Sequence, residues 1–73
     1  MTNNITSVVL NQSPTELYKI LKFEGLASSG AEAKMIIATG LVKVNRQIET
    51  RKRKKIIAGD TIEFDGYLLQ ITD

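Results

Sequence analysis

Residues 31–45 have the sequence AEAKMIIATGLVKVN, a stretch in which the spacing of the apolar residues changes part-way along. Three apolar residues of its first half recur at the i, i+3, i+4 spacing of one helix face, namely Ala33, Ile36 and Ile37. After Gly40 the apolar residues alternate instead, so Val42 and Val44 predict a strand with Lys43 on its other side. We expect Gly40 to adopt a left-handed conformation, because the helix must turn into a strand there at once.

Two capping patterns upstream predict where two helices begin. Ser29 and Glu32 form a capping box, so the helix of the 31–45 stretch should begin near Gly30. The sequence Ser13-Pro14-Thr15-Glu16 forms another, which predicts an earlier helix at about 14–24 that ends before Gly25. The inward face of that earlier helix consists of Leu17, Ile20 and Leu21. Two helices joined by a short turn that contains glycine predict a corner like that of a helix-turn-helix.

Short strands are predicted on both sides of the helices. Thr6–Leu10 is β-branched and apolar and suits an edge strand. Asn45-Arg46 lies where a turn is expected, with a return strand at Gln47–Ile48. Ile56 and Ile57 are followed by another turn signal, Gly59-Asp60.

The C-terminal part predicts a tight hairpin. Asp65-Gly66 is a strong signal for a two-residue turn between strands at 61–64 and 67–71. Such a turn places Phe64 opposite Tyr67, and in the same register Ile62 lies opposite Leu69. The apolar face of the hairpin then consists of Ile62, Phe64, Tyr67, Leu69 and Ile71. The predicted fold is therefore α+β, with two helices in a helix-turn-helix-like corner packed on a small, mostly antiparallel sheet.

Length and composition exclude several classes of function. A chain of 73 residues forms one domain at most, here 1–73, and has little room for a deep catalytic cleft. It contains neither cysteine nor histidine, so it lacks thiolate and imidazole ligands and the usual general base. The carboxylates Asp60, Glu63 and Asp65 suit turns and solvation better than acid–base chemistry. We therefore expect no catalysis, no cofactor and no metal.

The positive charge is concentrated in the middle of the chain. The net charge is +2, but residues 31–58 hold eight cations and two acids, while residues 59–73 hold four acids and no cation. Five adjacent cations, RKRKK, occupy positions 51–55, with Lys43 and Arg46 shortly before them. Such a run suits phosphate neutralisation, although a solvated loop has about even odds and a nuclear-import tag also fits the pattern. Few aromatic residues accompany the run, which favours recognition of backbone and shape over base stacking.

The start of the helix near Gly30 is a second candidate phosphate site. The amides of Gly30, Ala31 and Glu32, together with the helix dipole, suit a phosphate oxygen, and Lys34 lies one turn further along. An ordinary capped helix explains the same residues, and taken alone it is the preferred interpretation.

Together these residues resemble the RNA-binding domain first described in ribosomal small-subunit protein S-four, the αL RNA-binding motif. The resemblance covers about residues 15–64 and rests on the order Leu17, Leu21, Gly25, Ser29, Ala33, Ile36-Ile37, Gly40, Val42-x-Val44-Asn45 and Gly59-Asp60-x-Ile62. The length is similar to that of stand-alone bacterial members. The resemblance implies two helices on a small sheet, and binding of structured RNA through the second helix's start and the neighbouring hairpin.

The sequence departs from the family pattern at two positions. The residue after Ser29 is often Arg in the family and is Gly30 here, so one phosphate contact is absent. The residue after Asn45 is usually Gly and is Arg46 here, which strains a turn but adds a cation. The RNA-contacting residues that we predict are Ser29, Gly30, Lys34, Lys43, Asn45, Arg46, Arg51, Lys52, Arg53, Lys54 and Lys55. The amide of Asn45 suits a base or a 2′-hydroxyl, although a turn residue is the preferred interpretation.

The predicted function is binding of structured RNA, ribosomal or transfer RNA, and the ribosome is a candidate partner. Two alternatives remain open, namely a protein-interaction module for an acidic partner and a non-specific DNA or polyanion binder. No apolar run approaches the length of a membrane span, and the N-terminus does not resemble a secretory signal. We therefore expect a cytoplasmic monomer with neither a membrane nor a small-molecule substrate as its partner.

Overall fold

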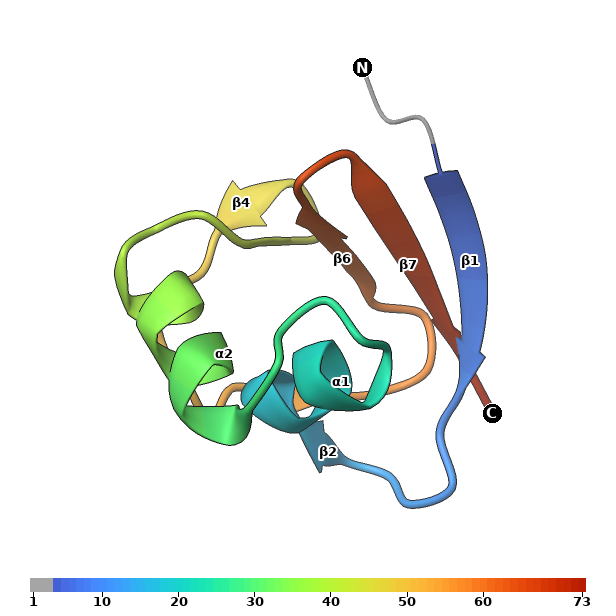
Figure 1. Ribbon diagram of the computed structural model, residues 1–73. Coiled ribbons are helices and arrows are strands. Elements are labelled where there is room, and N and C mark those ends of the chain that lie inside the picture. Colours follow the sequence, from blue (N-terminus) through green and yellow to red (C-terminus); the bar gives the residue numbers. More distant parts are fainter. Residues whose placement is uncertain (1–3) are drawn as a thin grey trace.

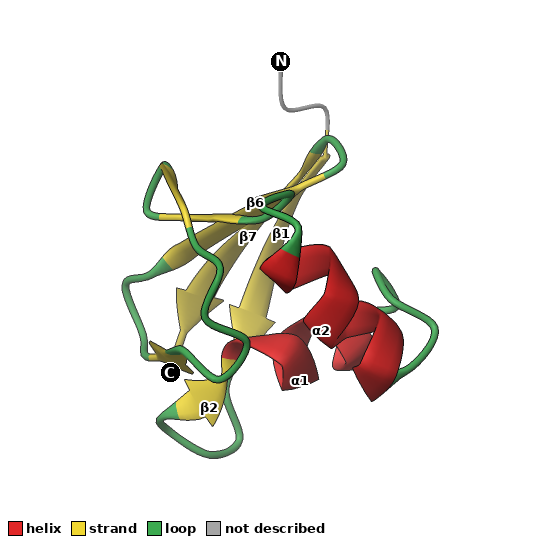
Figure 2. Cartoon of the chain, turned by 90° about the vertical axis from the view of Figure 1, so that its left-hand side faces the viewer, coloured by secondary structure: helices red, strands yellow, loops and turns green. Residues whose placement is uncertain are grey.

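A five-stranded sheet with the strand order β1-β7-β6-β3-β4 carries two helices on one of its faces (Figure 1). The computed structural model describes residues 4–73. The elements are β1 (Asn4–Val9), β2 (Thr15–Glu16), α1 (Leu17–Phe23), α2 (Gly30–Ala38), β3 (Lys43–Val44), β4 (Gln47–Ile48), β5 (Lys55–Ile56), β6 (Thr61–Phe64) and β7 (Tyr67–Thr72). Figure 2 shows the two layers edge-on, with the helices on one side and the larger sheet on the other. This confirms the predicted α+β class and the mostly antiparallel sheet.

The pairing of β6 with β7 follows the predicted register. Phe64 pairs with Tyr67 and Ile62 with Leu69, across a turn in which both Asp65 and Gly66 have positive φ. β3 pairs with β4 and β6 in antiparallel fashion, whereas β1 pairs with β7 in parallel. β1 is an edge strand as predicted, and it lies beside the last strand of the chain (Figure 1).

The core lies between the helices and the inner face of the sheet. Its buried apolar residues are Val8, Leu17, Ile20, Leu21, Ala27, Ala33, Ile37, Val42, Val44, Ile56, Ile62, Leu69 and Ile71. The helical and alternating spacings therefore identified most of the core. On the predicted hairpin face, however, Phe64 is only partly buried and Tyr67 is 37% exposed, because both lie at the turn end of the hairpin.

The first helix begins later than its capping pattern predicted. α1 starts at Leu17 instead of Pro14, and its N-cap Glu16 makes no side-chain capping hydrogen bond. Thr15 and Glu16 instead form β2, an antiparallel pair with Lys55–Ile56 of β5. Pairing with β5 requires an extended backbone at residues 15–16. This contact between distant segments therefore overrides the local capping pattern, and the helix begins after it.

The turns that follow the C-terminal ends of both helices agree with the prediction. Gly25 follows α1 with φ +76°, and Gly40 follows α2 with φ +81°. Asn45 and Arg46 connect β3 to β4 with φ of 52° and 69°, so Arg46 occupies a left-handed conformation.

Within residues 4–73, neither helix is long and apolar enough to cross a bilayer.

The left-handed conformation of Gly40 should be a stability determinant. A Cβ at Gly40 would lie 3.7 Å from Cγ2 of Ile48, an ordinary contact, so the cost of a substitution comes from the backbone. We expect Gly40→Val to lower the free energy of unfolding by more than about 1 kcal/mol, since a β-branched residue is strained at positive φ. Thermal melts check this, with Gly30→Ala as the control inside a helix. An unchanged melting temperature for Gly40→Val would contradict the assigned helix end.

Candidate nucleic-acid interface

The basic run, residues 51–55, is attached to the start of α1 through its backbone. The amide of Leu17 donates to the carbonyl of Lys54 at 2.9 Å, and the amide of Tyr18 donates to that of Lys52 at 3.2 Å. These bonds satisfy two of the amides that a helix start leaves without an intrahelical acceptor. The run is therefore held against the helices by its carbonyls, while its side chains remain available.

Three cations surround the ring of Tyr18, the second residue of α1. The Lys34 Nζ lies 4.6 Å from the ring centroid, the Arg53 Cζ 5.4 Å and the Lys19 Nζ 6.0 Å. These distances are within or at the limit of cation–π attraction, and we call Tyr18, Lys19, Lys34 and Arg53 the Tyr18 cluster. The cluster gathers positive charge from α1, from α2 and from the basic run at one place.

Gly30 brings the start of α2 against the same ring. A Cβ at Gly30 would lie 3.7 Å from Cε2 of Tyr18. The first turn of α2 therefore borders the Tyr18 cluster, where the helix dipole adds positive potential. Of the three amides predicted for a phosphate, the Glu32 amide is already bonded to the Ser29 hydroxyl at 3.1 Å, as expected of an N-cap.

The Glu32 carboxylate closes the loop before α2. It accepts hydrogen bonds from the Ser28 amide at 3.1 Å and the Ser28 hydroxyl at 2.9 Å. The predicted capping box is thus correct for Ser29, whereas the reciprocal contact of Glu32 reaches one residue further upstream. The hydroxyl of Ser29 has a structural role, and its predicted RNA contact stays a prediction.

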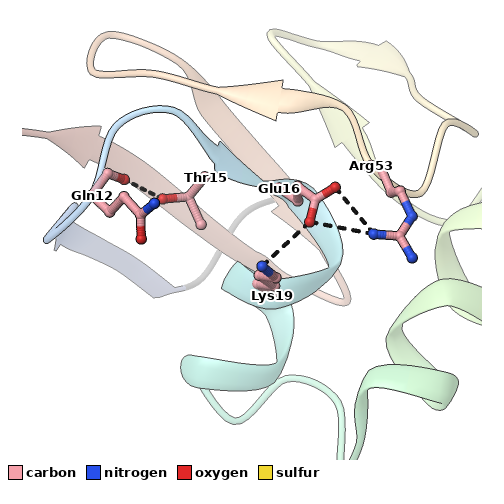
Figure 3. Close-up of polar contacts among 5 residues, drawn as sticks. All are labelled: Gln12, Thr15, Glu16, Lys19 and Arg53. Atoms are coloured by element: carbon pink, nitrogen blue, oxygen red, sulfur yellow. Dashed lines mark hydrogen bonds and ion pairs between the residues drawn. The ribbon is translucent and has the colours of Figure 1, made fainter.

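Glu16 links the Tyr18 cluster to β2 (Figure 3). Its carboxylate lies 3.3 Å from Nη1 of Arg53 and 3.4 Å from Nζ of Lys19. Shielding from solvent alone would raise the pKa of Glu16, but hydrogen bonds from Arg53 and Lys19 outweigh it and lower the pKa. The hydrogen bond with Glu16 in turn raises the pKa of Arg53. Glu16 is thus ionised and helps to hold Arg53 beside Tyr18.

Arg51, the first residue of the run, is also paired. Its Nε lies 2.9 Å from Oε2 of Glu49, its Nη2 lies 3.1 Å from Oε1, and its own amide donates to the same carboxylate. The hydrogen bond from Arg51 lowers the pKa of Glu49. The side chains of Arg51 and Arg53 remain 70% and 62% exposed, so both guanidinium groups keep a surface for a ligand.

Lys43 and Arg46 lie apart from the helix layer. Val44 next to Lys43 is buried towards the helices, so Lys43 points from the outer face of the sheet, where its cross-strand partner is Glu63. Arg46 is exposed in the β3–β4 turn. The predicted site is therefore divided: Gly30, Lys34 and Arg53 come together, whereas Lys43 lies on the opposite face of the sheet.

The side chain of Asn45 is engaged within the protein. Its amide nitrogen donates to Oδ1 of Asp60 at 3.0 Å, and its oxygen accepts from the Thr61 amide at 2.9 Å. These bonds fix the β3–β4 turn to the start of β6, so the geometry favours the interpretation of Asn45 as a turn residue.

Sequence reasoning missed Tyr18 and Lys19, which the structure places in the cluster. Both lie in the helix predicted at about 14–24, and nothing in their spacing relates them to Lys34 or Arg53. Only the packing of α1 against α2 and the basic run brings these side chains together.

Comparison with protein families matches residues 8–72 to the S4 domain. The chain belongs to the S4 domain family. It is 54% identical over 56 residues to YbcJ of Escherichia coli (strain K12), which covers 77% of this chain and 80% of that protein. YbcJ of Shigella flexneri gives the same values. The resemblance seen in the sequence is thereby confirmed.

A solved structure supports the same assignment. The solution structure of YbcJ from E. coli superposes with a TM-score of 0.72 at 44% identity, covering 100% of this chain and 94% of that one. That structure is described as revealing an αL motif involved in RNA binding. The fold of this chain is therefore that of the S4 domain, with the Tyr18 cluster on its helix layer.

The cations of the basic run should be dispensable for folding. Replacing Arg51, Lys52, Arg53, Lys54 and Lys55 with Gln keeps the carbonyls that cap α1 and removes two surface ion pairs, which contribute little to stability because solvent screens them. We expect a folded protein with a small change in melting temperature.

A core substitution beside the run is the matched control. Ile56→Ala truncates a fully buried side chain directly after the run and should cost about 2–5 kcal/mol. If the Gln variant unfolds, the side chains of the run are structural and the interface loses its main support.

Proposed function

We propose that this chain binds structured RNA, ribosomal or transfer RNA, without catalysing a reaction, and that the Tyr18 cluster is its main contact. The observation that carries the proposal is the convergence of Lys19, Lys34 and Arg53 on the Tyr18 ring, which borders the start of α2. The chain's membership of the S4 domain family supports it, as does the RNA-binding motif described for the structure of YbcJ.

The cations suit phosphate contacts more than base recognition. Lys34 is partly buried against Tyr18, whereas Arg53 is exposed and presents a planar guanidinium that matches phosphate geometry. Cations fixed by a ring and a carboxylate lose less conformational entropy on binding than free side chains. A rigid pair of this kind is suited to phosphates at a set spacing, which is how a protein recognises the shape of folded RNA.

Binding should therefore depend steeply on salt. With about four to six phosphate contacts, the slope of log affinity against log salt should be about −3 to −5. Fluorescence anisotropy with a labelled RNA stem-loop measures it. An affinity independent of salt would rule out the phosphate mechanism.

Single substitutions should locate the contact. Lys34→Gln and Arg53→Gln should each weaken binding and reduce the magnitude of the slope by about one unit or less. Lys43→Gln removes the same charge from the opposite face of the sheet and should have a smaller effect. If Lys43→Gln weakens binding more than either of the other two, the Tyr18 cluster is not the main contact.

Competition with DNA separates RNA recognition from generic attraction to polyanions. The unlabelled RNA stem-loop should displace the labelled RNA at about 0.15 M salt better than DNA of the same sequence, since the A-form shape and the 2′-hydroxyls differ. Equal competition by both would leave only a polyanion binder.

A further inference from the structure

A groove runs along α1 on the side of the helix that faces β1. It has a volume of about 540 Å³ and lies between α1 and the segment Val8–Thr15. Within this segment the hydroxyl of Thr15 donates to the carbonyl of Gln12 (Figure 3). Sites that hold small molecules have volumes of about 300–1,000 Å³, so the groove is large enough for a nucleotide.

The lining of the groove combines an aromatic ring, neutral amides and cations. Phe23, the last residue of α1, is 70% exposed there although it is apolar. Asn11 and Gln12 add side-chain donors and acceptors on the opposite wall. An exposed ring with amides on the facing wall suits an unpaired base, which stacks on the ring and exposes its edge to hydrogen bonds.

The charge of the groove also suits RNA. Three lysines line it, Lys19, Lys22 and Lys55, together with two acids. One of these acids, Glu16, is already paired with Lys19 and Arg53, which leaves an excess of positive charge. The charge of the rim therefore suits a nucleotide phosphate.

The groove is continuous with the Tyr18 cluster. Tyr18 and Lys19 belong to the cluster and also line the groove. An RNA strand that leaves the cluster along α1 would therefore enter the groove. An acidic peptide would also match the charge of the groove. Only an RNA bound at the Tyr18 cluster would reach the groove through the residues that the two sites share, so this continuity favours RNA.

We propose that this groove holds an unpaired nucleotide of the RNA bound at the Tyr18 cluster, stacked on Phe23. The inference rests on the proposed function and adds a preference: the protein distinguishes RNA with a single-stranded extension from RNA that ends in a blunt stem.

The test compares one stem-loop RNA in three forms: blunt, with a few unpaired adenosines at the 5′ end, and with the same extension at the 3′ end. One extended form should bind the unchanged protein about 5-fold more tightly than the blunt form or better, the gain expected of one stacked base. Phe23→Ala should abolish this preference and leave binding of the blunt form unchanged. Met35→Ala, an apolar residue on α2 that is 62% exposed and outside the groove lining, should keep it.

If Phe23→Ala keeps the gain, the nucleotide does not stack on Phe23 and the groove proposal is wrong. Tight binding of the blunt form without a gain from either extension overturns the groove proposal and leaves the proposed function intact. Failure to bind any of the three RNAs overturns the proposed function itself. If the extensions give no gain, and a labelled acidic, leucine-containing peptide binds the unchanged protein but not Phe23→Ala, the groove is a protein-docking site and the proposal is wrong.

Discussion

The start of α1 depends on two carbonyl oxygens supplied by the basic run. The amides of Leu17 and Tyr18 donate to Lys54 and Lys52, directly after the short pairing of β2 with β5. Without these acceptors the helix start would lack both a side-chain cap and partners for its first amides. One set of backbone bonds therefore begins the helix and holds the cationic segment against it.

The Tyr18 cluster follows from this constraint. Once the turn of residues 51–54 is fixed over the start of α1, Arg53 lies beside the Tyr18 ring, and Glu16 pairs with its guanidinium. The packing of α1 against α2 brings in Lys34 and places Gly30 against the ring. Like charges that would repel one another in an extended chain are thus held at one place by a ring, a carboxylate and backbone bonds, which concentrates positive potential there.

The features of the fold that depend on residues close in sequence could be predicted. Those that depend on contacts between distant segments could not. The left-handed turn at Gly40, the register of Phe64 with Tyr67, and the Ser29 cap all depend on residues close in sequence. The start of α1 was predicted wrongly because Thr15–Glu16 pairs with β5, and the ring of Tyr18 finds its cations only through tertiary packing. The same holds for the candidate interface. The basic run can be seen in the sequence, but the sequence does not show which of its cations lies near Lys34.

Mapping amide chemical shifts by NMR during titration with a stem-loop RNA tests the central claim most directly, because it reports on every face of the protein at once. If RNA binds at the Tyr18 cluster, the largest changes should occur at Gly30, Lys34 and Arg53, and the outer face of the sheet should change little. Changes confined to that outer face, at Lys43, Glu63 and Gln70, with the cluster unaffected, would contradict the account.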